Sequence, residues 1–325
     1  MTGRKTGLGK WVTGFWAVNL LCIAAAGMAW LASVASVPAG ATITLAPTIV
    51  SLPGATPTPA GAATPGSPPA PTATESWRPT RPAILTPTAN PSPQPRGGTI
   101  IGRSVARRPI EVFTFGNGPL KRLIVAGIHG GREWNTIRLA ELLMEHLRAH
   151  PETVPAEVTL YILPNLNPDG EARAHGPAGR VNDHGVDLNR NWPWNWQEDW
   201  SRAGCWTLLP VTGGTHAASE PEVAALLSFI QGNDIDALIS YHSAALGIFA
   251  GGYDYPPSVS LAEAVAEVTT YPWPPIDTGC EMTGDLTDWA AAKRIAAIDI
   301  ELTNHTSTDF SQNLEVLRVF LEWRR

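Results

Sequence analysis

The sequence predicts an α/β fold, a three-layer sandwich whose central sheet is mixed and mostly parallel. Apolar strand-like segments alternate with helix-like segments through residues 98–325, and such alternation is typical of parallel sheets covered by helices. These 228 residues are also enough to bury a large core. The first 97 residues differ sharply in composition and are not expected to join this fold.

Five strands and five helices are expected in this domain. The strands are short apolar runs, and the helices place apolar residues three and four positions apart. The expected strands are 111–115, 123–127, 158–165, 237–243 and 296–302. The expected helices are 133–149, 219–231, 260–269, 284–294 and 309–324. Ligands of open α/β sheets bind at the carboxyl ends of strands, so residues that follow these strands are the candidates for a site.

The N-terminal segment has the composition of a membrane anchor. Residues 1–10 carry three basic residues and no acid, and residues 11–37 contain no charge. As a helix, 11–37 would span roughly 40 Å, which is enough to cross a bilayer. We expect a basic cytoplasmic N-region at 1–10 and a transmembrane signal-anchor at 11–37. A cleaved signal peptide is the alternative.

Residues 38–97 hold 15 of the 30 prolines of the chain, interleaved with Thr, Ala, Ser and Gly. Such a segment cannot bury a core, so we expect a disordered linker. The domain at 98–325 would then be extracytoplasmic and membrane-anchored, or secreted if the N-terminal segment is cleaved.

The net charge of the domain limits the classes of partner that it can bind, and its cysteines can be paired or free. Residues 1–97 contain six basic residues and one acid, so the net charge of −6 leaves −11 for residues 98–325. This charge argues against a nucleic-acid partner. Cys205 and Cys280 could pair in an oxidising compartment or remain free thiols. Nothing in the sequence indicates an oligomeric state.

A candidate metal site begins with the sequence HGGREW, which follows the strand 123–127. Its histidine and glutamate are His129 and Glu133, and the two glycines between them let the backbone turn tightly. At a strand-to-helix turn, an imidazole and a carboxylate can point at one ion. His242 ends the strand 237–243 and would complete a His/Glu/His set that leaves one zinc position open for water.

A carboxylate in the strand 296–302 is a further candidate, because its burial is costly unless it is paired or functional. The two-residue period of a strand places Asp299 and Glu301 on the same face, so either could serve. A salt bridge or a solvent-facing edge would be a purely structural explanation for this pair.

Cations that could grip a carboxylate lie in two loops. Asn189 and Arg190, in GVDLNRNW, offer amide donors beside a guanidinium group, a combination suited to a carboxylate. Arg180 is another fixed cation, in a glycine-rich loop ten residues earlier. Exposed arginines are common, so these residues alone do not indicate a binding site. They do so only in combination with the candidate metal ligands.

Together these motifs resemble the zinc metallocarboxypeptidases, the carboxypeptidase A-like family. They stand in the order of the family: HGGREW, NPDG, GVDLNRNW, SYHS, TGDLTDW and IDIEL. The resemblance covers roughly residues 98–325 and implies the carboxypeptidase fold with one Zn²⁺ per chain. It also implies that the zinc ligands are His129, Glu133 and His242.

The resemblance implies roles for four other residues. Glu301 would be the general base that deprotonates the attacking water and later protonates the leaving amine. Arg180 would stabilise the oxyanion. Asn189 and Arg190 would hold the terminal carboxylate of the substrate, so the expected partner is a peptide with a free C-terminal carboxylate.

The sequence departs from the family pattern in three places. The family usually spaces its first ligands His-x-x-Glu, and here one extra glycine follows His129, which we interpret as a bulge that the two glycines absorb. The position of the mobile tyrosine of the family falls on or near Cys280, so no tyrosine role is assigned. The specificity position at Leu286 and Thr287 is neither acidic nor suited to binding aromatic groups, which leaves the side-chain preference open.

The expected function is that of an extracytoplasmic zinc carboxypeptidase hydrolysing C-terminal peptide bonds, with cell-wall peptides as the favoured substrate. A general peptide-scavenging carboxypeptidase is the alternative. Hydrolysis of stem peptides with diaminopimelate and a D-centre, compared with that of ordinary L-peptides, would distinguish the two functions. A non-catalytic wall- or peptide-binding module on the same scaffold is the rival outside enzymes. The extra glycine and the missing tyrosine favour that rival, whereas Glu301 argues against it. An amidohydrolase acting on acylated amino acids fits less well, because such relatives are typically cytosolic.

Overall fold

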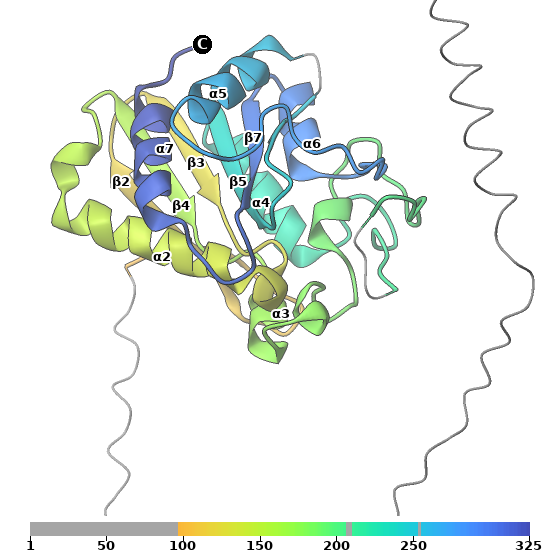
Figure 1. The fold of residues 1–325 in the computed structure, drawn as a ribbon. Coiled ribbons are helices and arrows are strands. Elements are labelled where there is room, and N and C mark those ends of the chain that lie inside the picture. Colours follow the sequence, from red (N-terminus) through yellow and green to blue (C-terminus); the bar gives the residue numbers. More distant parts are fainter. Residues whose placement is uncertain (1–96, 206–209, 253–254) are drawn as a thin grey trace, which may run out of the picture. The chain divides into compact units, whose positions relative to one another are not determined.

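The computed structural model describes residues 97–205, 210–252 and 255–325. In this part of the chain a seven-stranded sheet lies between layers of helices, with strand order β1-β2-β4-β3-β5-β7-β6 (Figure 1). The predicted three-layer α/β sandwich with a mixed sheet is therefore confirmed.

The centre of the sheet is parallel and its edges are antiparallel. The four strands that pair in parallel are β4 (Val158–Leu163), β3 (Leu120–Val125), β5 (Ala237–Ser243) and β7 (Ala296–Leu302). Antiparallel ladders add β2 (Pro109–Gly116) and then β1 (Thr99–Arg103) at one edge, and β6 (Ile248–Ala250) at the other. The carboxyl ends of the four parallel strands consequently meet at one edge of the sheet.

Helices cover both faces of the sheet (Figure 1). One face packs against α2 (Trp134–Ala149), α5 (Pro256–Ala266) and α7 (Phe310–Glu322). The opposite face packs against α4 (Pro221–Gly232) and α6 (Leu286–Ala292). Shorter elements are α3 (Pro168–Arg173) and the 3₁₀ turns η1 (Gly130–Glu133), η2 (Pro151–Thr153), η3 (Pro177–Gly179) and η4 (Leu188–Arg190).

Two hydrophobic cores explain why the central strands are continuous apolar runs. Successive side chains of a strand point to opposite faces. Ile124 and Ile239 accordingly join the core under α2 and α7, whereas Leu123 and Leu238 join the core under α4 and α6. A strand buried on both faces needs apolar residues at every position, which is the pattern that the sequence displays.

The expected strands 237–243 and 296–302 agree with β5 and β7, and each expected helix overlaps an observed one. Two strands and one α-helix among the described residues were not expected: β1, β6 and α3. The NPDG motif, interpreted as a turn, begins α3, where the Asn167 side chain accepts a hydrogen bond from the N–H of Gly170 at 2.8 Å. The proline after Asn167 takes the first helical position, which it fits well.

Within residues 97–205, 210–252 and 255–325, no helix combines the length and apolar character needed to cross a bilayer. The anchor expected at 11–37 and the linker expected at 38–97 lie outside these residues, apart from Gly97.

The additional glycine near His129 is accommodated in the 3₁₀ turn η1, where both glycines lie. Gly130 has a φ of +42°, a conformation that favours glycine. A Cβ atom on Gly131 would lie only 2.0 Å from the carbonyl oxygen of Ala174. The two glycines therefore let η1 pack directly on the backbone after α3, and this packing sets the direction of Glu133.

We expect Gly131→Ala to lower the free energy of unfolding by about 1–3 kcal/mol, because the added methyl group must displace backbone. Urea denaturation measures this change. The matched control is Gly232→Ala at the end of α4, where no atom lies within 4 Å of the added Cβ. That variant should be neutral or slightly stabilising, and an equal loss in both variants would contradict the packing argument.

Candidate metal centre and substrate cavity

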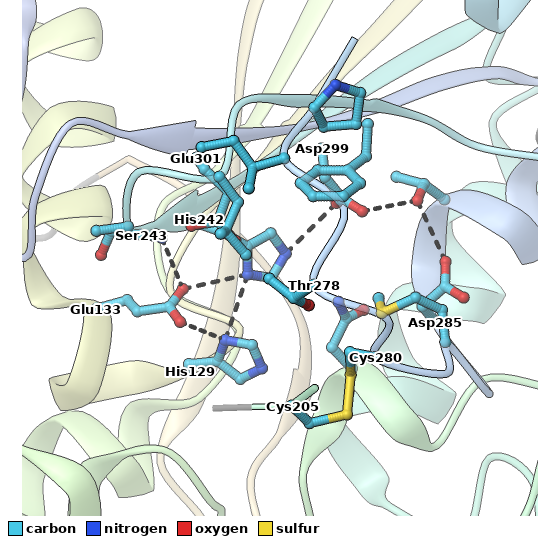
Figure 2. A pocket seen from close by; sticks show the side chains of 18 of the residues that line it. His129, Glu133, Cys205, His242, Ser243, Thr278, Cys280, Asp285, Asp299 and Glu301 are labelled. Atoms are coloured by element: carbon cyan, nitrogen blue, oxygen red, sulfur yellow. Dashed lines mark hydrogen bonds and ion pairs between the residues drawn. A yellow bond between two sulfur atoms is a disulfide. The ribbon is translucent and has the colours of Figure 1, made fainter. Parts of the chain in front are cut away.

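Residues predicted from separate motifs meet at the carboxyl ends of the parallel strands. His129 follows β3, His242 lies near the end of β5, and Glu301 near the end of β7. The register of β5 and β7 places His242 directly beside Glu301. All seven predicted site residues line one cavity of about 460 Å³: His129, Glu133, Arg180, Asn189, Arg190, His242 and Glu301. Figure 2 labels His129, Glu133, His242 and Glu301 among them.

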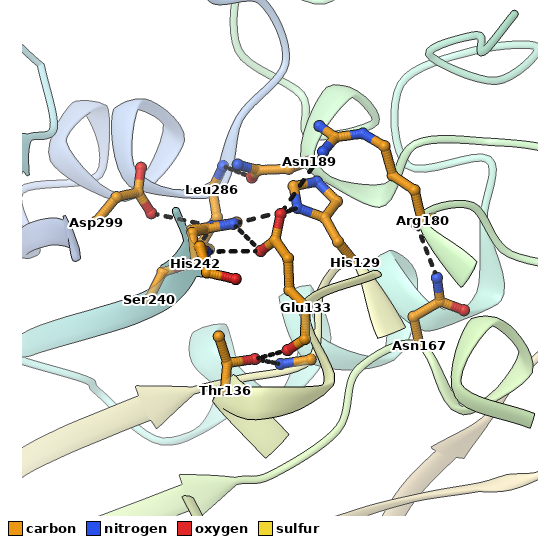
Figure 3. Close-up of polar contacts among 12 residues, drawn as sticks. His129, Glu133, Thr136, Asn167, Arg180, Asn189, Ser240, His242, Leu286 and Asp299 are labelled. Carbon is orange, nitrogen blue, oxygen red and sulfur yellow. Dashed lines mark hydrogen bonds and ion pairs between the residues drawn. The ribbon is translucent and has the colours of Figure 1, made fainter. Parts of the chain in front are cut away.

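Three of these side chains converge on a single point (Figure 3). The Nδ1 atom of His129 lies 2.7 Å from Oε1 of Glu133, and the Nδ1 atom of His242 lies 3.1 Å from Oε2 of the same carboxylate. The two Nδ1 atoms are 3.3 Å apart. One ligand atom from each residue lies within 4.8 Å of the others, and all three residues are buried, so the group could hold a metal ion.

The outer nitrogens of both imidazoles face carboxylates. The Nε2 atom of His129 is 3.0 Å from Oδ1 of Asp187. The Nε2 atom of His242 is 2.9 Å from Oγ of Ser240 and 3.4 Å from Oδ1 of Asp299. Such outer carboxylates fix the orientation and tautomer of a metal-binding histidine. With protons on the outer nitrogens, the two inner lone pairs would point at the Glu133 carboxylate. Positive charge between these groups relieves their repulsion, either as a proton on an imidazole or as a bound metal ion.

The charges around this point also favour a cation. Burial opposes the ionisation of Glu133, but His129 and His242 hold its pKa well below the usual range. Burial would lower the pKa of His242, but Asp299 and Glu133 raise it well above the ordinary value. Two imidazole nitrogens and one carboxylate oxygen are a common donor set for zinc with an open fourth position. The residues present therefore fit a zinc ion.

The two acidic residues of β7 have different surroundings. Asp299 accepts a hydrogen bond from the Thr287 hydroxyl through Oδ2 at 2.8 Å, and its Oδ1, which has no hydrogen-bond partner among the described residues, lies 3.4 Å from Nε2 of His242. The Oε2 atom of Glu301 is buried and has no hydrogen-bond partner among the described residues. Burial, and next the Glu133 carboxylate, raise the pKa of Glu301 to about 8. A carboxyl group with a pKa in this range can exchange a proton near neutral pH.

Arg180 is a fixed cation beside the three converging side chains. Its Nε atom donates to Oδ2 of Asp187 at 2.9 Å, and its Nη2 atom forms an ion pair with the same oxygen at 2.8 Å. Its Nη1 atom lies 3.6 Å from Oε1 of Glu133. Asp187 thus holds both Arg180 and His129. Its own pKa lies well below the usual range because Arg180 and His129 outweigh its burial.

Arg190 is a buried cation that forms no ion pair with the described residues. Only 6% of its surface is exposed, and among the described residues no carboxylate forms an ion pair with it. Its Nη1 donates to the carbonyl oxygen of Asn189 at 2.7 Å, and its Nε has no partner. The Asn189 amide oxygen accepts from the backbone N–H of Leu286 at 3.1 Å. A buried charge is stable only when it is compensated, so this part of the cavity is suited to an anionic ligand.

Sequence reasoning missed Asp187 and Asp285. Asp187 belongs to the quoted GVDLNRNW motif, but its two partners are fixed only by the fold. Asp285 precedes α6 and accepts a hydrogen bond from the N–H of Asp288 at 2.8 Å. An aspartate before a helix is an ordinary capping signal, and the sequence does not reveal that it also lines the cavity.

Cys205 and Cys280 form a disulfide bond, so the alternative of free thiols is not what the structure shows. Both cysteines line the cavity, where the bond ties together two loops that are 75 residues apart in sequence (Figure 2). Cys280 occupies the region where a mobile tyrosine was sought. Among the described residues no tyrosine lines the cavity.

Comparisons with known proteins agree with this geometry. The family model described as "Zinc carboxypeptidase" matches residues 97–317. The catalytic chain of carboxypeptidase N from Mus musculus is 31% identical over 171 residues, which are 45% of this chain and 37% of that protein. The present chain thus matches little more than a third of that relative.

A second relative is matched over nearly its whole length. Murein peptide amidase A of Escherichia coli strain K12 is 27% identical over 251 residues, covering 74% of this chain and 96% of that protein. The crystal structure of the murein-tripeptide amidase from Escherichia coli O157 superposes with a TM-score of 0.54 at 26% identity, over 71% of this chain and 94% of that one. The family model matches more than half of this chain, so the chain belongs to the zinc carboxypeptidase family.

Proposed function

We propose that this protein is an extracytoplasmic zinc-dependent carboxypeptidase that hydrolyses C-terminal peptide bonds of cell-wall peptides. The observation that carries the proposal is Arg190, a buried guanidinium group without an ion-pair partner among the described residues, in the same cavity as His129, Glu133 and His242. The terminal carboxylate of a peptide would supply the missing anion through paired N–H···O contacts. The peptide bond next to that carboxylate would then extend toward the metal ligands.

The chemistry follows from the side chains around that bond. Zinc held by His129, Glu133 and His242 would supply Lewis acidity. Glu301, poised near neutrality, takes a proton from the attacking water and delivers it to the departing amine. Arg180, held by Asp187, donates hydrogen bonds to the negative charge that develops on the carbonyl oxygen.

Cell-wall peptides are favoured as substrates because murein peptide amidase A, named for peptides of this kind, is matched over 96% of its length.

Two other features support an extracytoplasmic location of the domain. The disulfide Cys205–Cys280 is typical of an oxidising compartment, and the uncharged segment 11–37 is suited to a membrane anchor. Protease added to intact cells should digest the domain at 98–325, whereas full protection would contradict the location.

Arg190→Gln tests whether Arg190 binds the terminal carboxylate of the substrate. We expect the purified full chain loaded with zinc to cleave stem peptides with a free C-terminus, and not the same peptides as C-terminal amides. Arg190→Gln should lower kcat/KM by roughly 10–150-fold, the worth of a hydrogen bond to a charged group of about 1.5–3 kcal/mol. The rates on ordinary L-peptides are compared with the rates on stem peptides, to distinguish a general peptidase from one that acts on the cell wall.

The matched control for that experiment is Arg318→Gln on the surface of α7, where Arg318 pairs only with Glu315 and Glu322. This variant should keep full activity. Equal cleavage of acids and amides would contradict the carboxypeptidase assignment, and a preference for ordinary L-peptides would favour the general peptidase.

A further inference from the structure

The guanidinium group of Arg190 lies between two segments of irregular structure. Its Cζ atom lies 5.3 Å from the centre of the Trp200 ring, within the usual range of a cation–π contact. Its Nη2 atom donates to Sδ of Met282 at 3.4 Å. Trp200 and Met282 are 82 residues apart in sequence. The position of the guanidinium group therefore depends on how these two segments lie relative to each other.

A disulfide bond joins the same two segments next to these contacts (Figure 2). Cys205 follows Trp200 by five residues and packs against the buried cluster to which Trp200 belongs. Cys280 precedes Met282 by two residues. The backbones also touch there, because a Cβ atom on Gly204 would lie 2.1 Å from the carbonyl oxygen of Thr278. The bond thus holds together the two segments that contact Arg190.

Regular secondary structure does not fix these two segments. Among the described residues, 191–205 and 267–285 contain no helix and no strand. Backbone hydrogen bonds join them at one end, where the N–H of Trp192 donates to the carbonyl oxygen of Gly284 at 2.9 Å. An exposed hydrogen bond of 3.2 Å between side chains joins them farther along. A covalent bond is far stronger than these contacts, so the disulfide bond is the main constraint beside Arg190.

Two roles of this disulfide bond predict different results. A cross-link between residues 75 apart restricts the unfolded chain, so it stabilises the fold wherever it lies. A cross-link beside a binding group also holds that group in its bound geometry before the ligand arrives, which lowers the entropy cost of binding. The contacts of Arg190 with Trp200 and Met282 favour the second role in addition to the first.

We propose that the disulfide bond Cys205–Cys280 positions Arg190 for the terminal carboxylate of the substrate, so that substrate affinity depends on the intact bond. This inference rests on the proposed carboxypeptidase function and adds a positioning group to it. The metal ligands and Glu301 belong to other segments, at the ends of β3, β5 and β7 and in η1. Loss of the bond should therefore weaken binding and leave the hydrolytic step unchanged.

Reduction of the bond in the full chain, with zinc kept saturating, tests the proposal. Water and tris(2-carboxyethyl)phosphine convert the bond into two thiols and the phosphine into its oxide. We expect the KM for a stem peptide with a free C-terminus to rise by roughly 3–10-fold, the cost of ordering a flexible side chain on binding. The kcat and the bound zinc should stay the same, because a contact made equally to the substrate and the transition state alters KM alone.

Two sets of variants show whether the bond acts through Arg190. The double variant with Cys205→Ser and Cys280→Ser retains Cys22. Its KM should be raised as in the reduced chain, and the phosphine should cause no further change. In Arg190→Gln the group to be positioned is absent, so reduction should leave the KM of this variant unchanged.

An unchanged KM in the reduced chain would overturn the positioning role and leave the carboxypeptidase proposal intact. An equal rise of KM on reduction of Arg190→Gln would also overturn it, because the bond would then act by another route. Loss of zinc or of the far-UV circular dichroism signal in the reduced chain and the double variant would assign the bond a structural role only. No cleavage of any peptide by the oxidised, zinc-loaded chain would overturn the proposed function itself and this inference with it.

Discussion

Replacing Glu301 with glutamine is expected to lower kcat by about 10²–10⁴-fold, the usual contribution of a general acid–base group, while leaving bound zinc unchanged. Glutamine has nearly the same shape as glutamate but cannot take a proton from water. Glu301 makes no hydrogen bond through Oε2 with the described residues, so the substitution breaks no hydrogen bond of that oxygen. Steady-state kinetics and metal content, measured on the same preparation, give the two readouts.

Asp299→Asn is the matched comparison, because Asp299 lies two residues away on the same face of β7. Its contacts with Thr287 and His242 indicate that it orients a metal ligand. Loss of such an outer partner typically weakens metal affinity or activity by about 10–100-fold. Glu301→Gln should thus reduce turnover with zinc retained, whereas Asp299→Asn should reduce zinc affinity. The reverse pattern would make Asp299 the base.

The fold was predictable where local pattern and burial coincide. The strands β5 and β7 are buried on both faces, so their apolar runs have clear ends in the sequence. The strands β1 and β6 are short edge strands that exist through pairing with distant segments. Their sequences alone carry little signal, because strand preference depends strongly on context.

The site was predictable to the extent that its residues belong to ordered motifs at strand ends. Seven residues expected from the motifs line one cavity. The sequence did not indicate that Asp187 would hold both His129 and Arg180, because a loop aspartate has no periodic signature. It left the pairing of Cys205 with Cys280 open, because the distance between two loops is set by the packing of the whole domain.

Replacing His242 with alanine is expected to abolish high-affinity zinc binding, from about one ion per chain to little or none. The change leaves only His129 and Glu133 as ligands and removes the ring that Ser240 and Asp299 orient. Mass spectrometry of the purified full chain measures the metal content. Because zinc binds the folded form, saturation at 100 times Kd should stabilise the unmodified chain by about 2.7 kcal/mol, and a chelator should lower its Tm. The Tm of His242→Ala should not respond to zinc or chelator.

His150→Ala is the control for that experiment, because His150 lies beyond the end of α2 with its side chain 53% exposed and outside the cavity. It should keep zinc, activity and the response of Tm to chelator. Far-UV circular dichroism establishes that both variants are folded. Zinc retained at full affinity in His242→Ala would remove His242 from the ligand set. Its ring would then serve to position Glu133, and the lone pairs that converge on this carboxylate would need another explanation.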